Sequence, residues 1–363
     1  MFLIRQVTID DAPALLKLAK LVHSYNLPPN PDAIRSRILC ARDSFQGKIK
    51  DPSDRLYLFV LEDTDNGNVV GSSLIAPSVG TPEKPHLYFQ VRKREFYSED
   101  LQTGQVHTTL QLQADTTPHT EIGGLILSPA YRGHKARLGQ LLSRTRFNYL
   151  AMHRDQFCKT VIAEMMAPLT PDSRNTLWQY LGRRFINLSY TEADRFCEHS
   201  KEFILSLFPK EEIYVSLLPP EARNLIGKVG KETEPARVML ERLGFSSNGH
   251  VDPFDGGPHL EATIDNIPLI KETFSATLAN PVENLPLTGI ISSQGNSGSP
   301  GSPGFRATRA NYAQTEKTIS LAPDTAAALH AKPGETLSIT PTKIKNITPA
   351  EDQATNAPEK VGS

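Results

Sequence analysis

The chain has 363 residues, of which 39% are hydrophobic and 22% charged, and its formal net charge is −1. This composition excludes a wholly disordered chain and predicts one or two folded domains with a sizeable core. The balanced charge also argues against a nucleic-acid-binding protein, so an anion site must come from local clustering of basic residues.

The predicted elements follow from the periodicity of the apolar residues. In chain order they are a strand over 3–7 and a helix after it, a helix over 31–45, strands over 56–62 and 69–76, strands over 86–97, 106–114 and 122–127, a helix over 138–152, a strand over 160–165 and a helix ending at Leu181–Gly182. We expect Gly182 to stop that helix. The order predicts an α+β fold with a mixed, mainly antiparallel sheet flanked by helices.

Composition changes after residue 275 and predicts the domain organisation. Residues 1–274 form the expected main domain, and the Gly/Ser/Pro-rich run within 275–315 predicts a flexible linker. Two strands around a short helix predict a small β-containing C-terminal module over 316–343. The polar residues 344–363 are expected to be disordered.

The N-terminus predicts neither a signal peptide nor a membrane anchor. Its apolar run is four residues long and is soon followed by Asp10 and Asp11. The three cysteines, Cys40, Cys158 and Cys197, match no metal or redox spacing. We therefore expect a cytoplasmic protein with no membrane or nucleic-acid partner.

Residues 125–147 read LILSPAYRGHKARLGQLLSRTRF, a strand followed by a basic, glycine-containing turn and an amphipathic helix. Such a helix start receives anions, because its free N–H groups and dipole point at them. Gly133 and Gly139 would let the backbone approach phosphates, and Arg132, Lys135 and Arg137 would add positive charge. A basic helix start on the surface would give the same pattern.

This turn resembles the loop by which acetyltransferases of the GNAT superfamily hold the pyrophosphate of coenzyme A. More narrowly, the chain resembles the arginine N-succinyltransferase family. The similar segments keep their order up to about residue 343, and they include FVLED (59–63), LILSPAYRG (125–133), LLSRTRF (141–147), LWQYLGRRF (177–185), PARVMLERLGF (235–245) and DPFDGGPHLEA (252–262).

The resemblance implies a GNAT-like fold and transfer of a succinyl group from succinyl-CoA to the α-amine of arginine, in arginine degradation. Acyl-CoA would be a co-substrate, no cofactor would be bound permanently, and the protein would be a homo- or hetero-oligomer. Leu125 stands where the family contacts its acyl-CoA, and backbone N–H groups from Leu125 to Leu127 would polarise the thioester carbonyl. Four carboxylates are candidates for holding the substrate guanidinium, although each could be a cap or a surface charge: Glu164, Asp252, Asp255 and Glu261.

Gly230 departs from the family pattern. The family places a histidine, thought to be a proton donor, after an Ile-Gly-x-Val segment, and here Gly230 follows Ile226–Val229. Another group could supply the proton: His250 or His259, which flank the Asp-Gly-Gly-Pro segment, Lys228 or Lys231 beside Gly230, or water. Of these, His250 is the candidate catalytic residue. Alternatively, the enzyme uses a different acyl donor or amine, or the chain is a non-catalytic CoA-binding subunit.

Two further expectations concern single residue types. Arg137 occupies a glycine-type position of the family's loop. The histidines of the strand region, His86, His107 and His119, show no ligand spacing, so we expect no metal site.

Overall fold

Two β-sheets organise the chain in the computed structural model, which describes residues 1–21, 27–170, 175–197, 200–295 and 304–342. The larger sheet has eleven strands in the order β10-β7-β6-β3-β2-β1-β13-β12-β15-β11-β14, and the smaller has the order β8-β5-β4-β9. The strands are β1 (Phe2–Gln6), β2 (Tyr57–Asp63), β3 (Asn68–Val79), β4 (His86–Ser98), β5 (Thr103–Asp115), β6 (His119–Leu127), β7 (Thr160–Glu164), β8 (Ile213–Tyr214), β9 (His250–Val251), β10 (His259–Thr263), β11 (Phe274–Leu278), β12 (Leu287–Gln294), β13 (Phe305–Gln314), β14 (Thr318–Leu321) and β15 (Thr336–Pro341).

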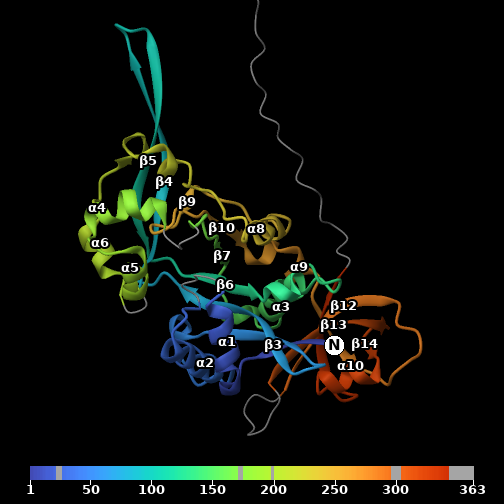
Figure 1. Cartoon of the computed structure of the whole chain (residues 1–363). Coiled ribbons are helices and arrows are strands. Elements are labelled where there is room, and N and C mark those ends of the chain that lie inside the picture. The colour runs from blue at the N-terminus through green and yellow to red at the C-terminus, as the bar shows by residue number, and fades with distance from the viewer. Residues whose placement is uncertain (22–26, 171–174, 198–199, 296–303, 343–363) are drawn as a thin grey trace, which may run out of the picture.

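Helices flank these sheets (Figure 1). They are α1 (Ala12–Ala19), α2 (Pro31–Phe45), α3 (Leu138–Met152), α4 (Arg183–Phe185), α5 (Tyr190–Cys197), α6 (Glu202–Leu207), α7 (Pro220–Arg223), α8 (Glu234–Glu241), α9 (Pro268–Lys271) and α10 (Pro323–Ala328). Among the described residues, the strand pairs β6–β7 and β11–β14 are parallel and the other pairs antiparallel, which confirms the predicted mixed, mainly antiparallel α+β fold. None of the described helices combines the length and the apolar composition needed to cross a bilayer.

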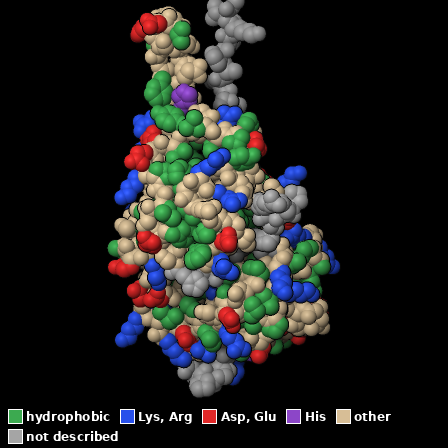
Figure 2. Space-filling view, turned by 60° about the vertical axis from the view of Figure 1, so that its left-hand side comes forward, with side chains coloured by type: hydrophobic (Ala, Val, Ile, Leu, Met, Phe, Trp, Pro, Cys, Tyr) green, Lys and Arg blue, Asp and Glu red, His purple; other side chains and the backbone are tan. Residues whose placement is uncertain are grey.

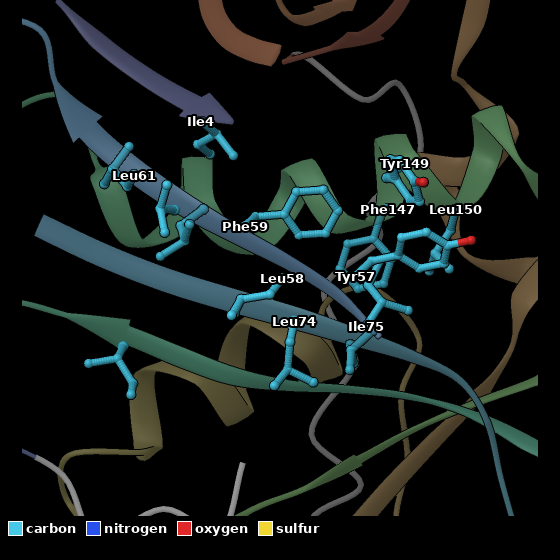
Figure 3. Close-up of a cluster of buried hydrophobic side chains, with 14 of the residues drawn as sticks. Ile4, Tyr57, Leu58, Phe59, Leu61, Leu74, Ile75, Phe147, Tyr149 and Leu150 are labelled. Carbon is cyan, nitrogen blue, oxygen red and sulfur yellow. The ribbon is translucent and has the colours of Figure 1, made fainter. Parts of the chain in front are cut away.

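The main core lies where α3 packs on β2 and β3 (Figure 3). The Tyr149 ring of α3 lies 4.9 Å from Tyr57 and 5.2 Å from Phe59, measured between ring centroids. Phe305 of β13 also reaches this cluster, with its centroid 5.3 Å from that of Phe59. The C-terminal third of the chain therefore contributes to the same core as the N-terminal strands.

The expected linker over 275–315 is wrong for most of its length. β12 and β13 pair along eight residues, and β11 pairs with β15. Alternating apolar residues such as Ala276 and Leu278 face a buried cluster, so these segments form strands despite the Gly/Ser/Pro run beside them. The part of that run at 296–303, like the expected disordered tail at 344–363, lies outside the described residues.

The predicted C-terminal module is also part of a larger unit. Its strands β14 and β15 form as expected, but β13 pairs with both β12 and β14, so five strands close into a ring. This ring continues the main sheet through the pairing of β1 with β13. The predicted boundary between residues 274 and 316 therefore does not separate two units.

Gly182 does not end its helix, contrary to the prediction. Residues Trp178–Gly182 form a π-helical turn, and α4 continues directly from it. A Cβ on Gly182 would lie 2.2 Å from the Trp178 ring. Glycine is thus needed to make room for Trp178, which is fully buried. By contrast, Gly244 after α8 has φ +89°, as a helix-stopping glycine should.

A two-stranded arm extends from the smaller sheet (Figure 1). We define it as residues 92–108, where β4 and β5 pair with each other beyond the contacts of β9 and β8. The exposed fractions of Phe96, Tyr97, Leu101 and Val106 on this arm range from 51% to 75%. Figure 2 shows hydrophobic side chains (green) along the arm.

Candidate functional site

The predicted basic turn connects β6 to α3, and the predicted helix over 138–152 is confirmed. Gly133 has φ +71° and Arg137 has φ +49°, a left-handed conformation that is uncommon for a residue other than glycine. No atom lies within 4 Å of a Cβ built on Gly133 or Gly139, so the backbone there is open to a ligand. Among the first N–H groups of α3, those of Gln140 and Leu141 donate to the carbonyl of Arg137, and those of Leu138 and Gly139 precede the first such bond.

The side chains of the turn differ in their availability. The hydroxyl of Tyr131 donates to Asp63 at 3.0 Å and anchors the start of the turn. Arg132 forms an ion pair with Glu232 and is therefore partly neutralised. Lys135 and Arg137 are exposed. Of the predicted basic residues, Lys135 and Arg137 have the greater freedom to meet an anion.

Three arginines gather at the start of α3. Arg144 lies two turns after Arg137, and Arg309 of β13 donates from Nη1 to the carbonyl of Ala136 at 2.8 Å. Burial, and then the charge of Arg137, lowers the pKa of Arg144. Burial, and then the charges of Arg144 and Arg137, lowers the pKa of Arg309.

Two of these arginines have side-chain N–H groups that make no hydrogen bond. Within the described residues, the buried Nε atoms of Arg144 and Arg309 have no hydrogen-bond partner. Mutually repelling guanidinium groups with free donors suit a multiply charged anion such as a phosphate group. Arg144 lies seven residues after Arg137, the N-cap of α3, and this spacing could have indicated Arg144 as a second basic group of the site. No sequence pattern indicated Arg309.

The strands β6 and β7 separate beside this turn. Within the described residues they pair at two positions, Thr120 with Val161 and Glu121 with Ile162. Beyond these positions β6 pairs with β3, and β7 pairs with β10. Leu125 and Leu127 lie on the part of β6 that no longer pairs with β7, and among the described residues no strand pairs with β6 on that side there.

A buried polar cluster lies at the end of β7. Glu164 of β7 and His259 of β10 are opposite each other in register, and His86 of β4 lies beside both. The distance from His86 Nδ1 to Glu164 Oε1 is 3.6 Å, and that from His86 Nε2 to His259 Nδ1 is 3.3 Å. The sequence indicated neither histidine as part of a cluster, because His86 lies 173 residues before His259.

The cluster is arranged as a chain. His86 turns one ring nitrogen to Glu164 and the other to His259. A metal ion takes a single nitrogen from each imidazole ring. One such atom from each ring and an oxygen of Glu164 lie within 4.8 Å of one another, so the expected lack of a metal site stays a prediction. The side chains form a row of interacting groups, Glu164–His86–His259.

The four candidate carboxylates have different surroundings. Asp255 is buried, and its two oxygens accept from the N–H groups of Gly257 at 2.7 Å and Ala167 at 3.0 Å. Both oxygens are thus used in holding a turn, and the substrate role predicted for Asp255 is not supported. Asp252 uses Oδ1 for the N–H groups of Phe254 and Asp255, and Glu261 accepts from Asn248. Glu164 faces the histidines.

His250 and Gly230 border the same region. The His250 ring stacks on Tyr88 of β4 with 3.9 Å between centroids, and burial lowers the pKa of His250. The N–H of Gly230 donates to the carbonyl of Met166, two residues after Glu164. A Cβ on Gly230 would lie 3.2 Å from the carbonyl oxygen of Ala167, so a side chain there would need a small shift.

Comparison with known proteins places this geometry in a family. Residues 2–269 match the family model described as "Arginine N-succinyltransferase beta subunit". The arginine N-succinyltransferase of Photorhabdus laumondii is 38% identical over 276 residues, which cover 75% of this chain and 79% of that protein. The same enzyme of Shigella boydii serotype 18 is 36% identical, with 80% and 83% covered.

A solved structure extends the similarity to the C-terminal strands. The structure of arginine/ornithine succinyltransferase subunit AI from Pseudomonas aeruginosa matches with a TM-score of 0.79 and 25% identity, and the match covers 94% of this chain and 98% of that one. It thus reaches beyond the part of the chain matched by the family model. With its separated β6 and β7 strands and the basic turn before α3, the chain belongs to the arginine N-succinyltransferase family.

Proposed function

We propose that this chain is an active transferase that moves the succinyl group of succinyl-CoA to the α-amine of arginine. The observation that carries the proposal is the placement of two complementary sites next to β6. The three arginines at α3 suit the phosphates of coenzyme A, and the carboxylates beside β7 and β10 suit a cationic amine. The named activities of the relatives agree with this pair of sites.

The residues divide the work as follows. Gly133, Gly139 and the first N–H groups of α3 approach the phosphates, and Lys135, Arg137, Arg144 and Arg309 supply charge. N–H groups of β6 near Leu125 and Leu127 polarise the thioester carbonyl, since that edge has no strand partner on the β7 side within the described residues. Asp252 and Glu261 are the proposed partners of the substrate guanidinium.

A non-catalytic CoA-binding subunit is the competing function, because the resemblance to the family implies a histidine at the position of Gly230. Such a subunit needs no titratable group near the reacting atoms. Glu164, His86 and His259 gather just beyond the point where β6 and β7 separate. Their position favours an active enzyme.

Release of free CoA thiol from succinyl-CoA tests the two functions. An active enzyme releases thiol only when arginine is added, and acetyl-CoA and ornithine serve as alternative substrates. Protein that releases none with any pair, yet melts at a higher temperature with CoA, would be a binding subunit. An arginine-dependent release would show that the chain does not require a histidine at position 230.

His250→Gln tests the proposed proton donor. Burial lowers the pKa of His250, so its protonated form is lost as the pH rises through that lowered value. The wild-type advantage in kcat over the variant should therefore be larger at pH 6 than at pH 8, and at pH 6 we expect about 10-fold or more. Equal rates at both pH values would show that water or another group protonates the thiolate.

The arm over 92–108 supports the proposed oligomer. A two-stranded hairpin is marginally stable alone, and this one exposes Phe96 and Leu101. The double variant Phe96→Ser/Leu101→Ser should weaken association about 100-fold or more, measured by light scattering across a dilution series. Leu217→Ser, at an 81% exposed position outside the arm, is the matched control. Unchanged mass in the arm variant would place the interface elsewhere.

The cellular location stays a prediction. Among the described residues, Cys40, Cys158 and Cys197 are not joined in disulfides, which agrees with a cytoplasmic protein.

A further inference from the structure

Glu164 is the member of the row Glu164–His86–His259 that reaches the surface. Its side chain is 26% exposed, whereas that of His86 is 7% exposed. His259 is 4% exposed, and its Nε2 atom is buried without a hydrogen-bond partner within the described residues. A bound substrate would therefore meet the carboxylate first, with the two imidazoles behind it.

The hydrogen-bonding capacity of these groups fixes the protonation of the rings. An ionised carboxylate only accepts, so it favours a proton on His86 Nδ1, the nitrogen that faces it. His86 Nε2 then has a lone pair, and the nearby His259 Nδ1 must be the donor to it. In this arrangement both rings are neutral: His259 donates to His86, and the Nδ1–H of His86 points at Glu164 Oε1 across 3.6 Å.

Burial keeps this pair neutral. It lowers the pKa of His86 to about 4 and that of His259 to about 3. Burial also raises the pKa of Glu164, although the charge of Lys201 acts in the opposite direction. An imidazolium beside Glu164 would stabilise its charge and make it a weaker base, whereas a neutral donor orients the carboxylate and leaves it basic.

We propose that Glu164 is the general base of the acyl transfer and that His86 and His259 are positioning residues that hold it by a neutral hydrogen-bonded pair. This inference rests on the proposed function. As the amine nitrogen forms its bond to the thioester carbon, an amine proton passes to Glu164 Oε1. The C–S bond then breaks with its electron pair on sulfur, and the thiolate takes a proton from His250 or water. Glu164 later returns its proton to solvent.

Several charged groups surround the row and set its titration. His86 and His259 experience charges from β5, β6, β9 and the residue before α6, and both His259 and Glu164 interact with the turn before β10. These groups are Asp115, His119, Glu121, Lys201, His250, Asp252 and Asp255. Because they remain in each variant below, differences between the variants report on the row itself.

Steady-state kinetics between pH 5 and 9 test the base. Glu164→Gln keeps the size of the side chain but cannot take the proton, so kcat should fall about 10²- to 10⁴-fold with little change in KM. The wild-type loss of kcat/KM at low pH should also disappear in this variant. His330→Asn is the control, because His330 is exposed with φ +52°, a conformation that asparagine tolerates.

Two His86 variants separate positioning from folding. His86→Asn retains a neutral donor near the position of Nδ1. The pH at which kcat/KM falls on acidification (the low-pH limb) should therefore be the same as in the wild type. His86→Leu removes the donor, and the limb should move up by about one pH unit or more. A residue with a merely structural role would lower the melting temperature in both variants and leave the limb unmoved, which would overturn the positioning role.

Nitrogen NMR of labelled histidines gives a readout that does not depend on activity. At pH 7 we expect neutral His86 and His259, each protonated at Nδ1. An imidazolium at either residue would overturn the proposed pair. An active wild type with a Glu164→Gln variant within threefold in kcat would overturn Glu164 as the base while leaving the transferase function intact. A wild type that releases no thiol with any amine would overturn both.

Discussion

Replacing Arg144 and Arg309 together with methionine is expected to raise the KM for succinyl-CoA about 100-fold or more. Each arginine would lose a charge-assisted hydrogen bond to a phosphate oxygen, which is worth about 10-fold or more in affinity. Methionine retains much of the aliphatic volume. Initial rates against succinyl-CoA concentration, at fixed salt, measure the effect.

The same double variant should lose little stability without ligand, because relief of repulsion offsets the hydrogen bond lost between Arg309 and the Ala136 carbonyl. The two guanidinium groups are desolvated and repel each other and Arg137, as their lowered pKa values indicate. Arg154→Met, which removes an exposed pair with Asp265, is the control and should leave the KM unchanged. A change in KM of less than threefold in the double variant would place the phosphates elsewhere.

Gly257→Ala is expected to lower the free energy of unfolding by about 3 kcal/mol. A Cβ at this position would lie 1.9 Å from the backbone oxygen of Met165 and 3.0 Å from the backbone nitrogen of Ala167. The turn would have to move away from β7, and Asp255 would lose the hydrogen bonds that it accepts from the N–H groups of Gly257 and Ala167. Urea denaturation measures the loss, and kcat should fall because the same turn leads into His259.

Gly104→Ala provides the comparison for this substitution. A Cβ there would make ordinary contacts, the nearest 3.6 Å from the carbonyl oxygen of Phe96. Its effect on the free energy of unfolding should stay below about 1 kcal/mol. If Gly257→Ala cost as little, the turn would be free to shift and would not fix His259.

Local patterns predicted the elements well where one segment carries all the information. The helix over 31–45 begins at Pro31 because Asn30 accepts from the N–H groups of Asp32 and Ala33. The helix over 138–152 likewise has its predicted limits. The prediction of a linker over 275–315 was wrong because it followed the Gly/Ser/Pro composition and not the alternation of apolar residues in β11 and β12.

The site was predicted only in part, because its groups come from distant segments. Arg137, Lys135 and the two glycines lie in one turn and follow from its sequence. His86, Glu164 and His259 come from β4, β7 and β10, and it is the meeting of two sheets that brings them together. Asp255 is a carboxylate and could bind a cation. The backbone N–H groups that occupy its oxygens belong to Gly257 and Ala167, and the contact with Ala167 becomes evident only in the folded structure.

The pairing of β1 with β13 also constrains how the protein is made. β1 lies between β2 and β13. One edge of β1 therefore stays unpaired until residues 305–314, which form β13, have left the ribosome. An open strand edge invites pairing with other chains. Because Arg309 arrives with the same strand, a nascent chain gains the last of the arginines proposed to bind phosphate in the step that protects it from aggregation.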